Sequence, residues 1–302
     1  MSILEDVRAA CAGIAASSHH VHVDEAAVPD YASSLASLPA PVWDPRLYKG
    51  DEASTVAFVL TLSAVNFGSG WFPLLRKTAP ASGYFTIAAA LGERFRVRGP
   101  FTAEELSALD TAECGRLFGQ GPEVEELMAL YADGLNEIGR LLLAGHGGSF
   151  TAFAAAAGGR AARLAQLLAQ MSSYEDAPFW KRAQLTASEL ALALDGRGLG
   201  AFSDLECLTA IADNLVPHVL RLDGILRYQP SLLAHIDAGH LLEHGSDEEV
   251  EIRACAVHAV ELVVAALDGG RTAAEIDNIL WARGQQPRYK AALRHRCRTT
   301  AY

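Results

Sequence analysis

Apolar residues recur at three- and four-residue spacing through much of the chain, and hydroxyl residues stand where several of these runs begin. Five segments have the form Ser/Thr-x-x-Glu before such a run: Thr102–Glu105, Thr186–Glu189, Ser203–Glu206, Ser246–Glu249 and Thr272–Glu275. In this capping box the hydroxyl accepts a hydrogen bond from an N–H of the first turn, and the Glu accepts one from the cap's own N–H. Together with the abundance of Ala, Leu and Glu, these signals predict a mainly α protein.

Strand signals are few. Alternation predicts short strands at residues 21–23 and 95–97, near the N-terminal side of the chain. The alanine-rich stretch 150–169 is expected to form a packed helix that uses small residues for close approach. The glycines of 195–200 resemble a helix–hairpin–helix turn, in which glycines end one helix and Ser203 caps the next.

The length of 302 residues suits one large domain or two small ones. We expect a single helical domain over residues 1–302. Its N-terminal segment, residues 1–50, ends in a proline-rich connector and is expected to pack on the rest. Residues 100–302 are expected to form the helical catalytic core.

The charge balance narrows the choice of partners. The formal net charge is −11, which argues against holding a nucleic-acid polymer by its phosphates and against docking on anionic lipid. Five scattered cysteines have no metal-ligand spacing, and neither do the histidines near residue 20, so we expect no metal. Free thiols in a reducing compartment, the cytoplasm, fit this cysteine usage.

The segment after Ser203 holds the most informative acid. Leu205, Leu208, Ala212 and Leu215 are expected to form the apolar stripe of one helix, with Asp213 at the edge of its buried face. Because a proline ring clashes with the carbonyl four residues earlier, Pro217 should kink or stop that helix at the aspartate. The break would present the carboxylate to a cavity. The alternative is a surface aspartate in an ordinary last turn of a helix, where an acid is electrostatically unfavourable.

Two further segments combine aromatic and polar side chains. In 179–184, two aromatic residues precede Lys181 and Arg182, which suits stacking on a base and neutralising a phosphate. The loop 66–72 combines an amide, aromatic rings and glycines, which suits recognition of a heterocycle. The alternatives are an amphipathic helix start for the first segment and a loop that packs its rings in the core for the second.

The stretch 246–267 is apolar on almost every side and should be a central helix. Charges within it need a partner or a ligand. Glu249 and Arg253 are four residues apart and can pair with each other. Glu251 and Arg253 are candidates for lining a polar pocket. The basic tail 288–298 is expected to dock on the acidic surface, or to close an anion site with His295 or Arg298.

Taken in order along the chain, these pieces resemble the queuosine salvage protein family, over roughly residues 56–302. The resemblance rests on the following segments: Asn66-Phe67 with Trp71, Ser82-Gly83-Tyr84, Leu135-Asn136-Glu137-x-Gly139, Gly147-Gly148-Ser149-Phe150, Lys181-Arg182-Ala183-Gln184, Ala212-Asp213 with Pro217, Glu249-x-Glu251-Ile252-Arg253, and His295-Arg296-x-Arg298. The chain departs from the family pattern in the longer gap before Trp71, and in having Trp180, Asn214 and His218 where other residues are usual.

The resemblance implies that the protein hydrolyses the N-glycosidic bond of queuosine 5′-monophosphate and releases queuine, a 7-deazaguanine base, for salvage into tRNA modification. It implies a fold similar to the helical DNA glycosylases, no cofactor, and a small-molecule substrate in place of a polymer or membrane. The aspartate matching Asp213 is the catalytic residue of the family.

On this hypothesis each part of the substrate has candidate contact residues. Trp71 and Trp180 stack on the base, Asn66 or Asn214 bonds its polar edge, and Glu251 pairs with its ammonium. Lys181, Arg253 and Arg298 are the candidates for the 5′-phosphate. The remaining expected substrate contacts are Phe67, Tyr84, His218 and His295.

Two other functions stay open from the sequence. One is a protein that binds a nucleotide or base without turnover, and the other is a glycosylase that acts on polymeric nucleic acid. A purely structural helical protein would leave Asp213, Lys181 and Glu251 scattered in space.

Overall fold

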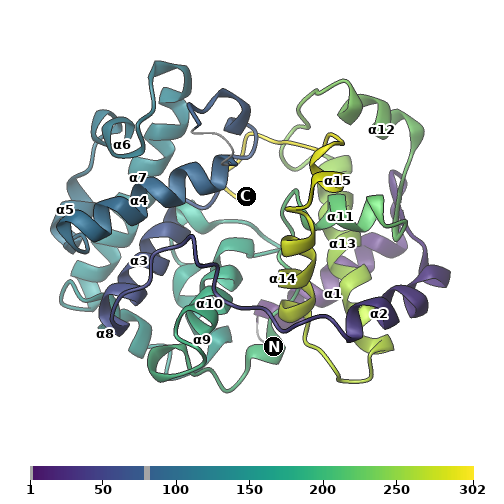
Figure 1. Ribbon diagram of the computed structural model, residues 1–302, viewed down its shortest axis with the longest axis horizontal. Coiled ribbons are helices and arrows are strands. Elements are labelled where there is room, and N and C mark those ends of the chain that lie inside the picture. The colour runs from purple at the N-terminus through teal and green to yellow at the C-terminus, as the bar shows by residue number, and fades with distance from the viewer. Residues whose placement is uncertain (1–2, 78–81) are drawn as a thin grey trace. The chain divides into compact units, whose positions relative to one another are not determined.

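The computed structural model describes residues 3–77 and 82–302 (Figure 1). These residues form helices joined by turns and coil, with one two-stranded antiparallel sheet. The prediction of a mainly α protein is confirmed.

The chain divides into two compact units, each built from separate stretches of sequence. Unit 1 comprises residues 1–41, 176–181 and 204–298, and unit 2 comprises 42–175, 182–203 and 299–302. The expectation of one domain over residues 1–302, with a catalytic core at 100–302, stays a prediction.

Unit 1 contains helices at both ends of the chain and the sheet. Its elements are α1 (Ile3–Ala16), β1 (Val21–Val23), the 3₁₀ turn η1 (Glu25–Ala27), α2 (Val28–Ala36), the 3₁₀ turn η6 (Leu205–Cys207), α11 (Val216–Leu222), β2 (Leu226–Tyr228), α12 (Pro230–Asp237), α13 (Asp247–Ala266), α14 (Ala273–Arg283) and α15 (Pro287–Lys290). The predicted strand at 21–23 is β1, and Val21 pairs with Tyr228 of β2.

Helix α13 is the centre of unit 1, as its all-round apolar pattern predicts. It contacts α1, α2, α11 and α14 (Figure 1). Ile252, Cys255 and Val260 on this helix have no exposed surface. Burying an aliphatic side chain completely contributes about 1.5–3 kcal/mol, so the helix is held by packing on several faces.

In the described part of unit 2, the regular elements are all α-helices or 3₁₀ turns. Its elements are α3 (Glu52–Ala64), η2 (Phe72–Leu74), α4 (Gly83–Arg98), α5 (Ala103–Ala108), α6 (Thr111–Phe118), η3 (Pro122–Val124), α7 (Glu125–Gly145), α8 (Phe150–Ala155), α9 (Ala161–Leu168), η4 (Ser172–Tyr174), α10 (Lys181–Ala193, whose first residue belongs to unit 1) and η5 (Gly198–Gly200).

Helix α7 passes very close to α5, and Gly139 makes this possible. A Cβ atom at residue 139 would lie 2.6 Å from the backbone nitrogen of Ser107 and 2.7 Å from the carbonyl oxygen of Ala103. Asn136, one turn earlier, donates from Nδ2 to the carbonyl oxygens of Leu106 and Leu109. The Asn-x-x-Gly part of the family motif therefore joins two helices of unit 2.

Several local predictions are wrong. Residues 95–97 belong to α4, because a three-residue alternation also fits one turn of a helix with Phe95 facing inward. The stretch 150–169 forms two short helices, since Gly158 and Gly159 interrupt it with φ of 61° and 68°. Thr186 lies inside α10 and does not cap a helix.

The capping boxes at Thr102 and Thr272 are confirmed in full, and Ser246 caps α13 by accepting a hydrogen bond from the Glu249 N–H. The predicted helix after Ser203 is absent, so the helix–hairpin–helix turn does not form. After α10 the chain makes only the 3₁₀ turns η5 and η6, and no α-helix begins before Val216.

In residues 3–77 and 82–302 no helix has both the length and the apolar character needed to cross a membrane.

Candidate functional site

Asp213 lies in an irregular turn of unit 1, directly before α11. Its Oδ1 accepts hydrogen bonds from the backbone N–H groups of Leu215, at 2.7 Å, and Val216, at 3.1 Å. Its Oδ2 makes no hydrogen bond to any residue of 3–77 or 82–302. The carboxylate is half-buried. One oxygen is therefore fixed and the other is available to a ligand.

The prediction that Asp213 sits in a kinked helix is wrong, although the predicted break exists. Pro217 is in the first turn of α11, where a missing N–H costs nothing, so it begins a helix and does not end one. Leu208, Ala212 and Leu215 are still buried, but a turn carries them in place of a helical stripe.

Two buried side chains hold the backbone just before Asp213. Oδ1 of Asp277, on α14, accepts a hydrogen bond from the Ile211 N–H at 2.8 Å. Nε of Arg253, on α13, donates to the Ala212 carbonyl oxygen at 2.8 Å. These backbone groups would bond within a helix, so tertiary partners replace the helical hydrogen bonds that the sequence pattern predicts.

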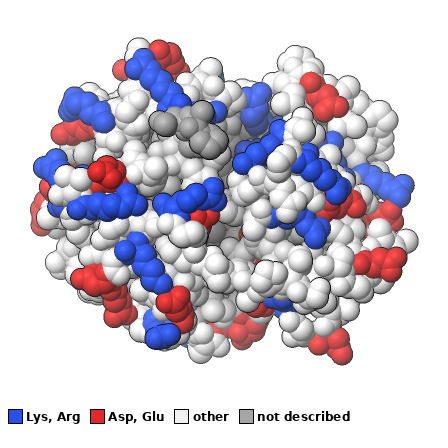
Figure 2. Space-filling model, viewed as in Figure 1, with Lys and Arg blue, Asp and Glu red and all other residues white. Residues whose placement is uncertain are grey.

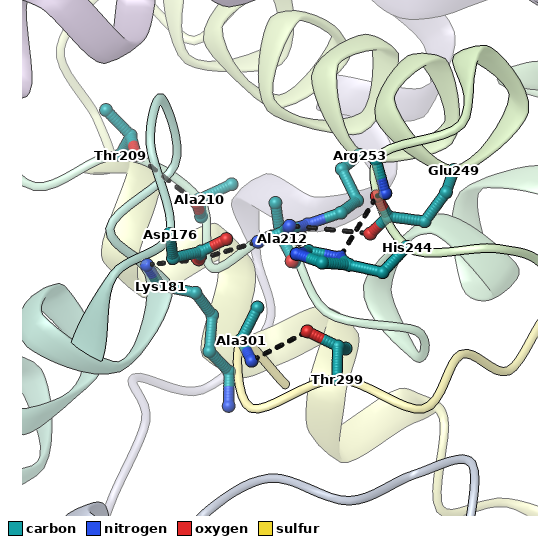
Figure 3. A network of polar contacts seen from close by, with 11 residues as sticks. Asp176, Lys181, Thr209, Ala210, Ala212, His244, Glu249, Arg253, Thr299 and Ala301 are labelled. Atoms are coloured by element: carbon teal, nitrogen blue, oxygen red, sulfur yellow. Dashed lines mark hydrogen bonds and ion pairs between the residues drawn. The ribbon is translucent and has the colours of Figure 1, made fainter. Parts of the chain in front are cut away.

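Arg253 is itself enclosed by acids (Figure 3). Its Nη2 lies 2.7 Å from Oδ2 of Asp176, and its Nη1 lies 3.4 Å from Oε1 of Glu249. The guanidinium carbon stacks 3.9 Å from the centre of the Phe179 ring. All three charged side chains are at most 3% exposed. The predicted Glu249–Arg253 pair is confirmed, and Arg253 lies in a buried network that supports the Asp213 turn.

Asp176 also fixes the start of α10. Its Oδ2 accepts a hydrogen bond from the Lys181 N–H at 3.0 Å, while the Lys181 side chain points away from the Asp176–Arg253 pair (Figure 3). Lys181 is only 4% exposed. The preceding residue, Trp180, has a φ of 52° and packs its ring against the core of unit 1.

The charges around Asp213 influence one another. Burial, and then the negative charge of Asp213, raise the pKa of Asp277 well above its usual range, while the Ile211 N–H and the Lys181 ammonium oppose this shift. Burial lowers the pKa of Arg294, and the charge of Asp213 opposes that shift. Within unit 1, Asp213 therefore acts on one carboxyl group and one cation, and Lys181 acts on Asp277.

Other predicted substrate contacts in unit 1 bond to the protein. Glu251 accepts hydrogen bonds from the backbone N–H groups of His19, His20 and Val21, and so anchors β1. Asn214 donates from Nδ2 to the His295 carbonyl oxygen at 3.4 Å. Burial lowers the pKa of His295 to about 3, so this ring is neutral in the fold.

The basic tail 288–298 is expected to dock on acidic side chains, and one of its arginines does so. Arg288 pairs with Asp223, and Arg296 donates to the Gly239 carbonyl oxygen. On the face shown in Figure 2, Lys and Arg side chains gather over α15, whose last turn holds Arg288 and Lys290. Arg298 is exposed.

The remaining predicted contacts lie in unit 2. Phe67 meets Tyr131 edge to face, and the guanidinium of Arg182 lies over the Phe67 ring. Trp71 is 3% exposed and donates from Nε1 to Glu126 at 2.8 Å. Tyr84 packs edge-on against Phe85. The substrate-binding roles of these residues and of Asn66 stay predictions.

Sequence reasoning missed Asp277 and Asp176, and it included Arg294 only as part of the basic tail 288–298. Asp277 had a usable signal, because it stands among the buried positions Ala273, Ile276 and Leu280 of α14. An acid on an apolar helix face needs a partner, and here that partner is the backbone of the Asp213 turn.

His218 makes folding sensitive to acid. Its Nε2 meets the Tyr289 carbonyl oxygen at 2.8 Å, and its Nδ1 meets Nη2 of Arg221 at 3.2 Å. These partners require a neutral ring that carries its proton on Nε2. Burial lowers its pKa to about 4.

The unfolded chain therefore takes up a proton near pH 6.5, where the folded chain does not. The contribution of His218 to stability is complete above that pH and is lost towards pH 4, at about 1.4 kcal/mol per pH unit. The His218→Gln variant keeps a donor near Tyr289. We expect its unfolding free energy, measured by urea titration, to fall less steeply between pH 6.5 and pH 4 than that of the wild type. The exposed His22→Gln is the control, and an unchanged slope in His218→Gln would contradict the assignment.

The structure is that of a mainly α protein, and its candidate site is the turn of unit 1 in which one oxygen of the Asp213 carboxylate is fixed. Residues 46–302 match the family model described as queuosine salvage protein, and the chain belongs to this family. A protein of Sphaerobacter thermophilus named queuosine 5′-phosphate N-glycosylase/hydrolase is 34% identical over 304 aligned residues, covering 93% of each chain. Proteins of the same name from Mus musculus and Dictyostelium discoideum are 31% and 32% identical, covering 74% and 67% of this chain and 73% and 66% of their own.

Proposed function

We propose that this protein hydrolyses the N-glycosidic bond of queuosine 5′-monophosphate, yielding queuine and ribose 5-phosphate. The observation that carries the proposal is the Asp213 carboxylate. One of its oxygens is held by two backbone N–H groups and the other is available, in a chain that belongs to the queuosine salvage family. A relative bearing the name of this activity aligns with 93% of the chain.

Asp213 acts on the sugar in this proposal. Breaking an N-glycosidic bond builds positive charge on C1′ and O4′ of the ribose. A carboxylate beside these atoms stabilises that charge, whether it then captures C1′ or positions the attacking water. Preorganised groups of this kind contribute about 3 kcal/mol or more each to lowering the barrier. Water supplies the hydroxyl to the sugar and the proton to the departing base.

Lys181 is the proposed cation for the 5′-phosphate. It belongs to unit 1, is buried, and its charge acts on Asp277, the neighbour of Asp213. Arg253 is engaged with Asp176, Glu249 and Ala212, so we assign it no phosphate contact. His218 and Glu251, which are bonded within the protein, likewise receive no substrate contact.

Lys181→Ala should raise KM for the 5′-phosphate far more than KM for the nucleoside. A hydrogen bond to a charged group is worth about 1.5–3 kcal/mol, which corresponds to roughly 10- to 100-fold. Steady-state kinetics on both substrates measure the effect, with the exposed Lys290→Ala as control. Equal losses on the two substrates would remove Lys181 from phosphate binding.

The substrate is proposed to be a free nucleotide in the cytoplasm. A single nucleotide needs only a local cationic pocket, so a net charge of −11 is compatible with it and disfavours a polymer. All five cysteines are free thiols, which suits a reducing compartment.

Incubation with queuosine 5′-monophosphate, followed by chromatography, separates hydrolysis from binding. We expect free queuine to accumulate over many turnovers. Saturable binding with no free base would instead identify a nucleotide-binding protein.

A further inference from the structure

Two consecutive residues before Asp213 are held by side chains from two different helices. The N–H of Ile211 is bonded to Asp277 of α14, and the carbonyl of Ala212 is bonded to Arg253 of α13. The N–H of Asp213 closes the turn by donating to the Ile211 carbonyl oxygen at 2.8 Å. The path of the backbone into Asp213 is thereby fixed on both sides.

Packing alone does not explain an aspartate at position 277. It is 4% exposed on the buried face of α14, where an apolar side chain would avoid the cost of removing a carboxyl group from water. The groups that act on it are the Ile211 N–H, the Asp213 carboxylate and the Lys181 ammonium. Burial and the charge of Asp213 both favour its neutral form. The side chain gives the turn an acceptor, and its raised pKa reflects its burial and the cost of a second negative charge beside Asp213.

We propose that Asp277 is a positioning residue for Asp213: its Oδ1 holds the Ile211 N–H and so sets where the Oδ2 of Asp213 meets the sugar. This inference rests on the proposed function. Asp277 makes no contact with substrate in this inference. It supplies an acceptor atom to the Ile211 N–H.

The acceptor can be kept or removed by substitution. Asparagine at 277 keeps an oxygen at the same reach and is neutral. Leucine has similar size but no acceptor, so it leaves the buried Ile211 N–H unsatisfied. Serine keeps a polar group but is too short to reach Ile211, and it serves if the leucine variant does not fold.

The matched control is Asp223→Asn. Asp223 is also a buried acid of unit 1, but it bonds Tyr31, Tyr289, Arg283 and Arg288, none of which holds the Asp213 turn. Its loss should lower the melting temperature and leave kcat of the folded enzyme unchanged.

The experiment measures kcat, KM and melting temperature of the wild type and of the Asp277→Asn, Asp277→Leu, Asp277→Ser and Asp223→Asn variants. We expect Asp277→Asn to retain wild-type kcat. Asp277→Leu or Asp277→Ser should lose kcat on the order of 100-fold, with KM nearly unchanged, because a misplacement of about 1 Å costs that much. A purely structural role would lower the melting temperature without this split between kcat and KM.

Wild-type kcat in folded Asp277→Leu or Asp277→Ser would overturn the inference. Equal loss in Asp277→Asn and Asp277→Leu would overturn it too, because the acceptor alone would then not be what matters. The proposed function fails separately, if the wild type releases no queuine or if Asp213→Asn remains active.

Discussion

We expect Asp213→Asn to lose nearly all release of queuine and to keep its fold. Asparagine keeps an oxygen that accepts the N–H groups of Leu215 and Val216, so the turn before α11 persists. It removes the negative charge that we propose stabilises the ribosyl cation. We expect kcat to fall by at least roughly 1000-fold, at the upper end of the effect of deleting one preorganised electrostatic group.

The measurement is queuine release under saturating substrate, with the melting temperature of each variant as the check on folding. The exposed Asp237→Asn, in the same unit, controls for loss of an acid from the surface. Asp213→Ala should be equally inactive and also less stable by about 1 kcal/mol, because it loses both backbone hydrogen bonds. Near-wild-type turnover in either variant would show that the mechanism is wrong.

Arg253→Leu should lower the free energy of unfolding by about 3–5 kcal/mol, the cost of leaving buried charges without their partner. Asp176 and Glu249 would both lose the guanidinium, and the Ala212 carbonyl would lose its donor. Stacking on Phe179 would be lost as well. Urea unfolding of purified protein measures the change.

Arg288→Leu is the matched control, because it removes an arginine from an ion pair whose arginine is 65% exposed. Exposed pairs contribute at most about 1 kcal/mol, so this variant should stay close to wild type. If Arg253→Leu lowers the free energy of unfolding by less than about 1 kcal/mol and raises KM only for the 5′-phosphate, the structural role of Arg253 is contradicted. Arg253 would then be a phosphate-binding residue.

The parts of the fold that could be predicted from sequence are those set by neighbouring residues. The all-round apolar pattern of 246–267 predicts a central helix, and the four-residue spacing of Glu249 and Arg253 predicts their pair; both are confirmed. The Thr102 and Thr272 capping boxes are confirmed because their hydrogen bonds close within one turn.

The parts that could not be predicted depend on distant partners. The pattern of residues 205–215 fits a helix, but Asp277 and Arg253 take the backbone groups that a helix would use internally. Glu251 is an acid within an apolar helix, so it needs a partner or a ligand, and its oxygens bond a segment about 230 positions earlier in the chain. Pro217 marks a break in either interpretation, and only the structure shows that a helix begins there.

The decisive measurement compares two substrates in separate incubations. The protein is incubated either with queuosine 5′-monophosphate or with a tRNA that contains the same concentration of queuosine, and free queuine and ribose 5-phosphate are quantified in each incubation. We expect equal molar amounts of the two products from the nucleotide and none from the tRNA. Base release from the tRNA, or binding of the nucleotide with no free base, would contradict it.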